Sequence, residues 1–428
     1  MTAKQGGLIA ADLWKPEMFR IALKLLAGDK AKYAGLLFGI TFTSFLVTFA
    51  GSYFCGFMTR GFALIAENPE VDVWVMNPAV ESIEQATNIP LSALDRVRST
   101  EGVRFAAPLA VGTGEVIYPS GRFQPFQVIG LDDATLTGAP PIEDGVSPDV
   151  MRSPDAVIID TGGTSGKLDT SARRSDQWQR GPPRVDVLTR PLAAGDELLV
   201  NDRRVVVRGH AKALPRYPPR PLLYTTYSNA ARILLRSRHR LTFVLAMAEP
   251  GVNLSELAVR IQERTGLKAR TAADFKADTV RWYLATSEDV GDIAAMLILA
   301  MSVGFGVTGV MLYMFTSEHL KQYAVLKALG ATTQLLLAMI FVQAGVCALL
   351  GTGLGLGVCA IVGQLVAQAA DYPFRIMWFT PVIAGAMVLL VSLVAAAMSA
   401  RPLLRLEPGS FSQDVRPVWG LWARTMTI

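Results

Sequence analysis

Few residues in this 428-residue chain have the types and spacing that catalysis requires. A His-Glu-x-x-His metal motif and a Gly-x-Ser-x-Gly nucleophile motif are both absent, and the only histidines are His210, His239 and His319. TGGTSGKLD (161–169) comes near the phosphate-loop pattern. However, Thr161 stands where that pattern needs glycine, and Leu168 where it needs a Mg²⁺-binding hydroxyl. The chain is therefore expected to hold no nucleotide, cofactor or metal and to have no catalytic residue.

Two further features, a glycine-rich run and the cysteines, do not form binding motifs because they lie in apolar stretches. GTGLGLG (351–357) lies inside a long apolar stretch, which does not suit a dinucleotide-binding loop. The cysteines, Cys55, Cys347 and Cys359, also lie in apolar stretches, so no zinc pattern is available and no disulfide is expected between 60 and 292.

Four stretches contain no charged side chain, and the placement of the other residues depends on them: 33–59, 293–317, 328–370 and 376–400. A helix needs about 20 apolar residues to cross the hydrocarbon core of a bilayer, and every stretch is longer than that. We predict one span in the longest stretch, at 335–365, because Gly330 and the threonines after it are typical of a loop. The alternative, buried helices of a soluble core, seldom extends so far without a charge.

The charge distribution predicts how the spans are oriented. Residues 60–292 carry 28 Lys and Arg against 29 Asp and Glu, whereas the rest of the chain carries 13 against 7. The basic excess lies before the first span, between the second and third, and after the fourth. The positive-inside tendency places these parts in the cytoplasm and 60–292 outside, in the periplasm of a cell with an inner membrane. The pI near 9.1 is explained in this way without a nucleic-acid partner.

Absence of charge inside the spans also limits function. Ion-driven carriers place ionisable residues within the membrane, and these spans contain none, which argues against secondary transport and against a hydrophilic pore.

The predicted organisation is a membrane protein with four transmembrane helices and a large α+β extracytoplasmic domain between the first and second. An amphipathic helix at 16–28, with basic residues on its polar side, is expected to lie in the cytoplasmic interface. The predicted parts are a cytoplasmic N-terminus (1–32), helix 1 (33–59), the domain (60–271), a stalk with helix 2 (272–317), a coupling segment (318–334), helix 3 (335–365), helix 4 (376–400) and a cytoplasmic tail (401–428).

Within the domain, β-rich runs predict strands at 71–76, 156–160, 197–213 and 241–248. Asn201-Asp202 predicts a hairpin in the third of these. Apolar spacing predicts helices at 91–100 and 254–266, the second ending at Gly266. Residues 161–192 are rich in Gly, Ser, Arg and Pro and have few large apolar residues, so they are predicted to form an exposed loop.

Residues 272–292 have helical character without an evident break. If this helix continued into 293–317, it would form a single rod of about forty residues, roughly 60 Å long at the standard rise. Such a rod would link the domain rigidly to the coupling segment.

Glycines at four-residue spacing indicate where spans approach closely. They occur in helix 1, at Gly35 and Gly39, and in helix 3, at Gly351 and Gly355, with a second pair at Gly353 and Gly357. These glycines could bring together helices of one chain or helices of two chains in a dimer, and both alternatives stay open.

The coupling segment carries the polar residues Glu318, His319, Lys321 and Lys327 between two uncharged apolar stretches. Its helix would offer an apolar side of Tyr323, Val325, Leu326 and Leu329, and would end at Gly330, with Thr332 or Thr333 capping the next span. A short helix with apolar side chains and a polar rim suits docking into a groove of another protein. An ordinary basic loop is the alternative.

At this point the sequence resembles a known family. FTSEHLKQYAVLKALGATTQLLLAMIFVQA (315–344) is similar to the cytoplasmic segment of MacB/FtsX-family ABC transporter permeases, closest to the DevC-type branch. Supporting stretches follow in the same order along the chain: VDVWVM (71–76), VIGLDD (128–133), LTFVLA (241–246), TGLKARTAADF (265–275) and ARPLLRLEPGSF (400–411).

The resemblance implies a homodimeric permease subunit that docks on a separate cytoplasmic ATPase, which binds ATP-Mg. It implies partners beyond the membrane, a periplasmic adaptor and an outer-membrane channel, and a hydrophobic or lipid-like cargo. ATPase contacts would come from Glu318, Lys321, Leu326, Lys327 and Gly330, and from Arg405, Leu406 and Pro408 in the tail. Two alternatives stay open: an FtsX-like signalling permease that regulates a periplasmic enzyme without transport, and a membrane-anchored receptor or scaffold without an ATPase.

Overall fold

The computed structural model describes residues 30–85, 87–119, 121–143, 145–160, 168–172, 189–234, 240–328, 331–370 and 372–401. The chain divides into two compact units. A helical unit takes its described residues from Met1–Cys55, Gly291–Ala367 and Phe374–Ile428, and an α/β unit takes them from Gly56–Val290 and Gln368–Pro373. The amphipathic helix expected at 16–28 and most of the loop expected at 161–192 lie outside the described residues. The described parts of that loop contain a short antiparallel pair of strands, β6 (Asp169–Ser171) and β7 (Thr189–Pro191), which the loop prediction did not include.

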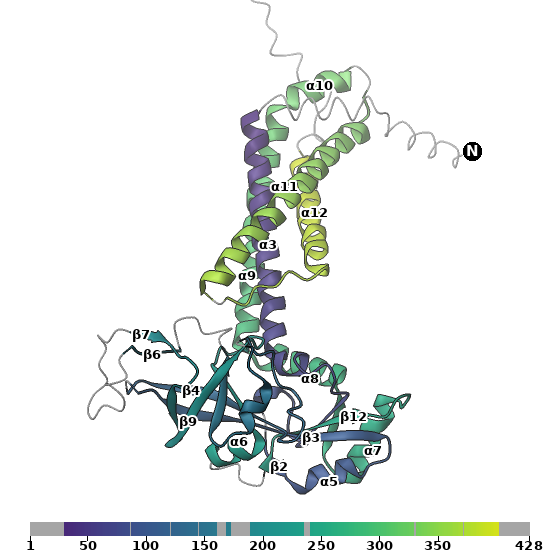
Figure 1. The fold of residues 1–428 in the computed structure, drawn as a ribbon. Helices are drawn as coiled ribbons and strands as arrows, with labels where there is room; N and C mark the ends of the chain where they lie inside the picture. The colour runs from purple at the N-terminus through teal and green to yellow at the C-terminus, as the bar shows by residue number, and fades with distance from the viewer. Residues whose placement is uncertain are drawn as a thin grey trace, which may run out of the picture. The chain divides into compact units, whose positions relative to one another are not determined.

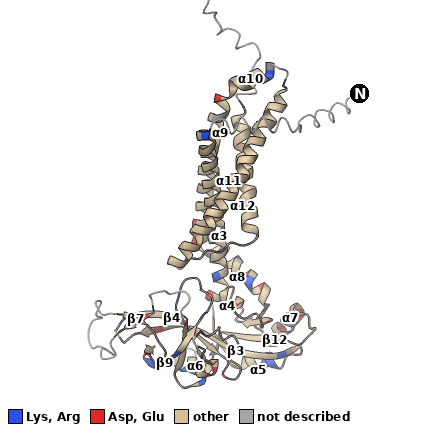
Figure 2. Ribbon diagram, turned by 45° about the horizontal axis from the view of Figure 1, so that its top comes forward, with Lys and Arg blue, Asp and Glu red and all other residues tan. Residues whose placement is uncertain are grey.

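Four long helices are apolar enough and long enough to cross a membrane, as the sequence predicts (Figure 1). They are α3 (Lys30–Gly61), α9 (Glu288–Glu318), α11 (Thr333–Ala370) and α12 (Phe379–Ser399). The 43-residue apolar run holds a single helix, α11, as expected. Between α9 and α11 lies the short α10 (Leu320–Ala328). Figure 2 shows charged residues at α10 and none along the middle of α11 and α12.

The predicted forty-residue rod is wrong. Helix α8 (Ala272–Thr286) ends at Ser287, whose backbone is extended (φ −81°, ψ 126°), and α9 begins at the next residue. The Ser287 hydroxyl donates to Asp289 Oδ2 at 3.2 Å, so this serine lies at the start of a new helix, followed directly by two acidic residues. The domain therefore connects to α9 through a bend.

The α/β unit is built on a sheet of order β13-β1-β12-β3-β4-β10-β5-β9-β8. Strand β3 (Val103–Ile117) is shared between two parts of it. Its first half pairs with β12 (Phe243–Ala248), and β1 (Val73–Met76) and β13 (Lys268–Thr271) complete an antiparallel flat part. Its second half pairs with β4 (Phe123–Leu131).

The second half of β3 also closes a ring of strands. After β4 come β10 (Leu222–Thr226), β5 (Ala156–Asp160), β9 (Arg203–Ala211) and β8 (Glu197–Val200), and β8 returns to β3 through Val116–Val200 and Ile117–Leu199. All six strands contribute to one buried apolar cluster, with side chains such as Phe126, Val157 and Leu223. The result is a small barrel with a filled interior.

Helices cover the flat part on both faces. Helices α5 (Ser92–Arg98) and α7 (Leu254–Thr265) pack over one face with Val73, Val75 and Val244. On the other face Trp74 and Phe243 meet Phe275 of α8. The remaining described elements are short: α4 (Ala63–Ala66), α6 (Tyr227–Ile233), β2 (Ile89–Pro90), β6 (Asp169–Ser171), β7 (Thr189–Pro191), β11 (Arg240–Leu241) and the 3₁₀ turns Ile83–Gln85 and Pro148–Arg152.

The predicted elements of this unit are found with small shifts of their ends. Asn201 and Asp202 have φ of 48° and 63° and connect β8 to β9 as the expected hairpin turn. Gly266 ends α7 with φ 68°, again as expected.

Candidate transmission site

The connection between α9 and α11 begins at His319, a turn residue that separates α9 from α10. Its carbonyl accepts from Tyr323 N at 3.0 Å, and Leu326 O accepts from Ala331 N at 3.0 Å after α10. Thr332 Oγ1 accepts from Leu335 N at 3.3 Å, so Thr332 caps α11, one of the two threonines expected to do so. Hydrogen bonds therefore fix the chain both before α10 and after it.

Tyr323 anchors α10 to the helices on either side. It is fully buried, within an apolar cluster that includes Leu312 of α9 and Leu336 and Ile340 of α11. Its hydroxyl donates to Gln343 Oε1 of α11 at 3.4 Å. The expectation that Tyr323 belongs to an exposed docking side is therefore wrong, because its side chain fills the bundle. Any displacement of α10 must disturb both α9 and α11.

The outward surface of α10 is smaller than predicted. Val325 is 60% exposed, whereas Leu326 is partly buried against the cluster around Tyr323. Glu318 is exposed at the end of α9, and Lys327 is partly exposed on α10. Lys321 also lies on α10, and the other predicted ATPase contacts, Gly330, Arg405, Leu406 and Pro408, lie outside the described residues.

Glycines let α3 lie against two other helices of the helical unit. A Cβ on Gly39 would lie 2.7 Å from Val307 Cγ1 of α9, and Gly35 faces Met311 of the same helix. A Cβ on Gly351 of α11 would lie 2.6 Å from Ile40 Cγ2.

A second glycine of α11 that faces α3 is Gly355, where a Cβ would lie 2.6 Å from the carbonyl oxygen of Thr41. Ser44 of α3 donates to the Thr352 carbonyl at 3.3 Å in the same crossing. Gly353 and Gly357 have nothing within 4 Å of a Cβ, so the two glycine pairs of α11 have different surroundings.

A second contact joins the last turns of α3 to α8 within the α/β unit. Phe57 makes edge contacts with Tyr217 and Tyr283, with ring centroids 4.4 and 5.2 Å apart. The Tyr283 hydroxyl donates to the Tyr217 carbonyl at 3.3 Å. A Cβ on Gly61 would lie 2.5 Å from Tyr283 Cε2. Sequence reasoning missed this contact, because no spacing relates residues more than 150 positions apart.

A buried ion pair fixes the chain just after α4. Arg216 donates to Glu67, which also accepts from Leu214 N–H, and the hydroxyl of Tyr224 donates to Glu67 Oε2 at 3.4 Å. Both charged side chains are almost fully buried. Burial raises the pKa of Glu67, and the Arg216 guanidinium opposes that rise. Breaking such a pair would leave an uncompensated charge inside the unit.

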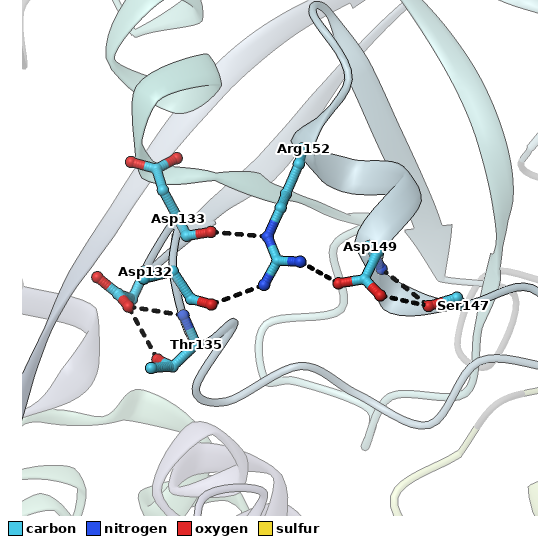
Figure 3. A network of polar contacts seen from close by, with 7 residues as sticks. Asp132, Asp133, Thr135, Ser147, Asp149 and Arg152 are labelled. Atoms are coloured by element: carbon cyan, nitrogen blue, oxygen red, sulfur yellow. Dashed lines mark hydrogen bonds and ion pairs between the residues drawn. The ribbon is translucent and has the colours of Figure 1, made fainter.

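Figure 3 shows a further polar network, around Arg152. Its guanidinium donates to the carbonyl oxygens of Asp133 (2.8 Å) and Ala134 (2.6 Å) and pairs with Asp149. Asp132 Oδ2 accepts from the amide and hydroxyl of Thr135. Every carboxylate in this network is engaged by a neighbour, so it holds the turn after β4 in place and offers no reactive group.

Among the residues that the structure describes, no group of three His, Cys, Asp or Glu is placed to hold a metal ion.

Comparison with known families identifies the segment that contains α10. Residues 294–408 match the family model described as the FtsX-like permease C-terminal domain. This segment is similar to the FtsX-like permease family. It includes most of α9, then α10, α11 and α12, so the helix anchored by Tyr323 lies within it. The match agrees with the expected resemblance to FtsX-like permeases over this segment, and the DevC-type branch stays a prediction.

Two solved structures are similar to parts of the chain. One is the extracellular domain of the noncanonic ABC-type transporter YknZ from Gram-positive bacteria, at 12% identity and a TM-score of 0.31, covering 47% of this chain and 98% of that one. The other is the periplasmic region of MacB from Actinobacillus actinomycetemcomitans, at 12% identity and a TM-score of 0.34, covering 49% and 92%. No curated protein matches the chain.

Proposed function

We propose that this chain is the permease subunit of an ABC-type export system, transmitting conformational change from a separate ATPase to its own α/β unit. The observation that carries the proposal is the anchored α10 within the FtsX-like segment. FtsX-like permeases work with a cytoplasmic ATPase, and α10 is a short helix with one exposed apolar residue between two candidate spans. The ATPase would bind ATP-Mg, and this chain would bind neither.

The packing of the helical unit explains how a movement of α10 would spread. Tyr323 links α10 to α9 and α11, and α3 packs closely against α9 at Gly39, opposite Val307, and against α11 at Gly355. Close-packed interfaces do not deform continuously, so a displaced α10 would carry its neighbours with it. Helices α3 and α9 each contribute residues to both units, so the polypeptide itself continues the path.

The positive-inside distribution supports a cytoplasmic α10 and an extracytoplasmic α/β unit in a bacterial inner membrane. We infer a homodimer that works with a periplasmic adaptor and an outer-membrane channel and exports a hydrophobic or lipid-like substrate. Because the spans contain no charged residue, they do not provide a polar pathway across the membrane. This favours a substrate that is moved on the outer side of the bilayer.

Two variants of Tyr323 test the transmission. Tyr323→Ala removes the anchor, whereas Tyr323→Phe keeps the ring and loses only the hydrogen bond to Gln343. We expect both variants to co-purify with the ATPase. In the alanine variant ATP hydrolysis should continue while envelope lipid export falls at least tenfold, and the phenylalanine variant should remain close to wild type.

Two results would contradict the proposal. One is a purified chain that binds no ATPase, which favours the receptor or scaffold. The other is full export by a folded Tyr323→Ala variant. Deletion of the gene gives a further test. If it leaves the envelope lipids unchanged but alters peptidoglycan hydrolysis, the result would favour the signalling function over export.

A further inference from the structure

A basic hollow lies on the α/β unit where β13 meets α8. Its cavity volume is about 300 Å³. Strand β13 contributes Lys268 and Arg270, and α8 contributes Asp278, Arg281 and Trp282, with Glu81 and Ala285 completing the lining. None of these residues takes part in the contacts described above between α3 and α8.

Three cations in this hollow share one carboxylate. Asp278, whose side chain is 10% exposed, lies 3.0 Å from Arg270 Nε, 2.5 Å from Arg281 Nη2 and 3.7 Å from Lys268 Nζ. Lys268 Nζ also donates to the Val80 carbonyl at 2.7 Å, which fixes its position. Asp278 therefore occupies part of the hydrogen-bonding capacity of the basic side chains, and would compete with a second anion for them.

The charges of the hollow do not balance. Its lining has three basic and two acidic side chains. Each guanidinium has five N–H donors in a planar fork, so a single carboxylate cannot satisfy both arginines. Arg270 and Arg281 are exposed, and their remaining donors are available to a second anion that offers several oxygens, such as a phosphate.

The other wall is apolar, and the hollow is near a membrane span in the sequence. Trp282 and Ala285 form this wall. Trp282 precedes α9, a candidate membrane span, by six residues along the chain. Tryptophan is enriched at membrane–water interfaces because one end of its ring system is apolar and the other is polar.

A second hollow, of about 400 Å³, adjoins the same two basic residues of β13 and includes Pro78 and Leu267. A ligand longer than a phosphate ion could therefore extend along both sides of Lys268 and Arg270.

From these observations we propose that the hollow between β13 and α8 binds the phosphate of an anionic phospholipid headgroup. Arg270 and Arg281 would hold the phosphate, with Trp282 against the glycerol and upper acyl carbons. The proposal depends on α9 crossing the membrane and not on the ATPase partner, so it can fail or hold separately from the proposed export function.

Lipid retention by the purified full-length chain provides the test. The chain would be exchanged in detergent against equal amounts of phosphatidylglycerol and phosphatidylcholine, and bound lipid counted by native mass spectrometry. We expect preferential retention of phosphatidylglycerol. Each of Arg270→Gln and Arg281→Gln should weaken it about fivefold, the usual effect of one basic residue at an anionic surface.

Two variants separate a binding site from a structural network. Arg208→Gln makes the same charge change at an exposed position of β9 and should retain lipid like wild type. Asp278→Asn removes the competing carboxylate and should increase phosphatidylglycerol retention, whereas loss of a purely structural network would decrease it. Thermal unfolding confirms that each variant is folded.

Three outcomes would overturn the proposal: equal retention of the two lipids, equal losses in Arg208→Gln and Arg270→Gln, or decreased retention in a folded Asp278→Asn variant. Competition by inorganic phosphate at the same concentration as the lipid would assign the site to free phosphate and overturn the lipid assignment.

Discussion

Gly61 lies so close to Tyr283 that a Cβ at position 61 would be 2.5 Å from the tyrosine Cε2. Real side chains essentially never come this near, so the last turn of α3 touches α8 only because residue 61 is glycine. Tyr283 is also held by Phe57 and by the Tyr217 carbonyl. A first membrane span and the helix that leads to the second are thus in contact at their junction with the α/β unit.

Gly61→Ala should therefore destabilise the protein. Alanine normally favours a helix over glycine by about 1 kcal/mol, but overpacking against a fixed ring costs about 1–3 kcal/mol. Gly291→Ala, in a helix with nothing within 4 Å, should be neutral or stabilising. Thermal unfolding in detergent measures both, and Tyr283→Leu should rescue Gly61→Ala. Equal stability of the two alanine variants would contradict the contact.

The two glycine pairs of α11 should respond differently to the same substitution. Gly355→Val forces the new side chain against the Thr41 carbonyl and Ser44 of α3, and we expect a loss of at least about 2 kcal/mol. A Cβ on Gly357 has no described residue within 4 Å, so Gly357→Val should keep its thermal stability. The oligomeric mass of each variant should be recorded as well. Dissociation of a dimer by Gly357→Val alone would assign the outward pair to dimerisation, whereas a stable Gly355→Val would refute the crossing with α3.

Val325 provides the sharpest test of where the ATPase docks. Placing a carboxylate there by Val325→Asp should weaken co-purification with the ATPase at least tenfold, because an unpaired charge is costly in an apolar contact. The fold should survive, since this side chain is already 60% exposed. Val259→Asp on α7, at 57% exposure, is the matched control and should leave the complex intact. Normal ATPase recovery with Val325→Asp would move the docking site away from this face of α10.

The buried pair of Glu67 and Arg216 predicts a pH dependence. Burial raises the pKa of Glu67 above its ordinary value of 4.5. Its contribution to stability is therefore fully present below that value and is lost as pH rises through the higher folded pKa. Arg216→Met removes the opposing cation, so the pKa of Glu67 rises further and the loss extends to higher pH.

We accordingly expect Arg216→Met to lower the unfolding temperature much more at pH 7.5 than at pH 5, by about 3–5 kcal/mol of stability at the higher pH. Glu67→Gln combined with Arg216→Met should remove most of the difference. Arg204→Met breaks an exposed pair with Glu197 and should change little at either pH. An equal effect of Arg216→Met at both pH values would count against the assigned shift.

The sequence predicted the elements whose signal is local. Four spans follow from the lengths of uncharged stretches, and the β8–β9 hairpin follows from Asn201-Asp202, whose types tolerate positive φ. The bend at Ser287 was also readable, since a serine followed by two acidic residues is typical of a helix start. The helical character of 272–292, without an evident break, favoured a continuous helix instead.

Other features have no local signal. Apolar side chains are spread around α10, so spacing could not tell that Tyr323 points into the bundle while Val325 points out. The Glu67–Arg216 pair joins residues 149 positions apart, and the strand ring closes through Val116 and Val200, which are also far apart in the sequence. Such contacts are decided by tertiary packing.

The sharing of β3 has an evolutionary consequence. Residues 103–109 belong to the flat part and 110–117 to the barrel, without a linker between them. Recombination or gene truncation at this point would divide β3, and each part would keep only a fragment of the strand. The flat part and the barrel are therefore expected to be inherited together. Lineages that diversify this protein should do so by lengthening surface loops, and should not exchange one half for a homologue's.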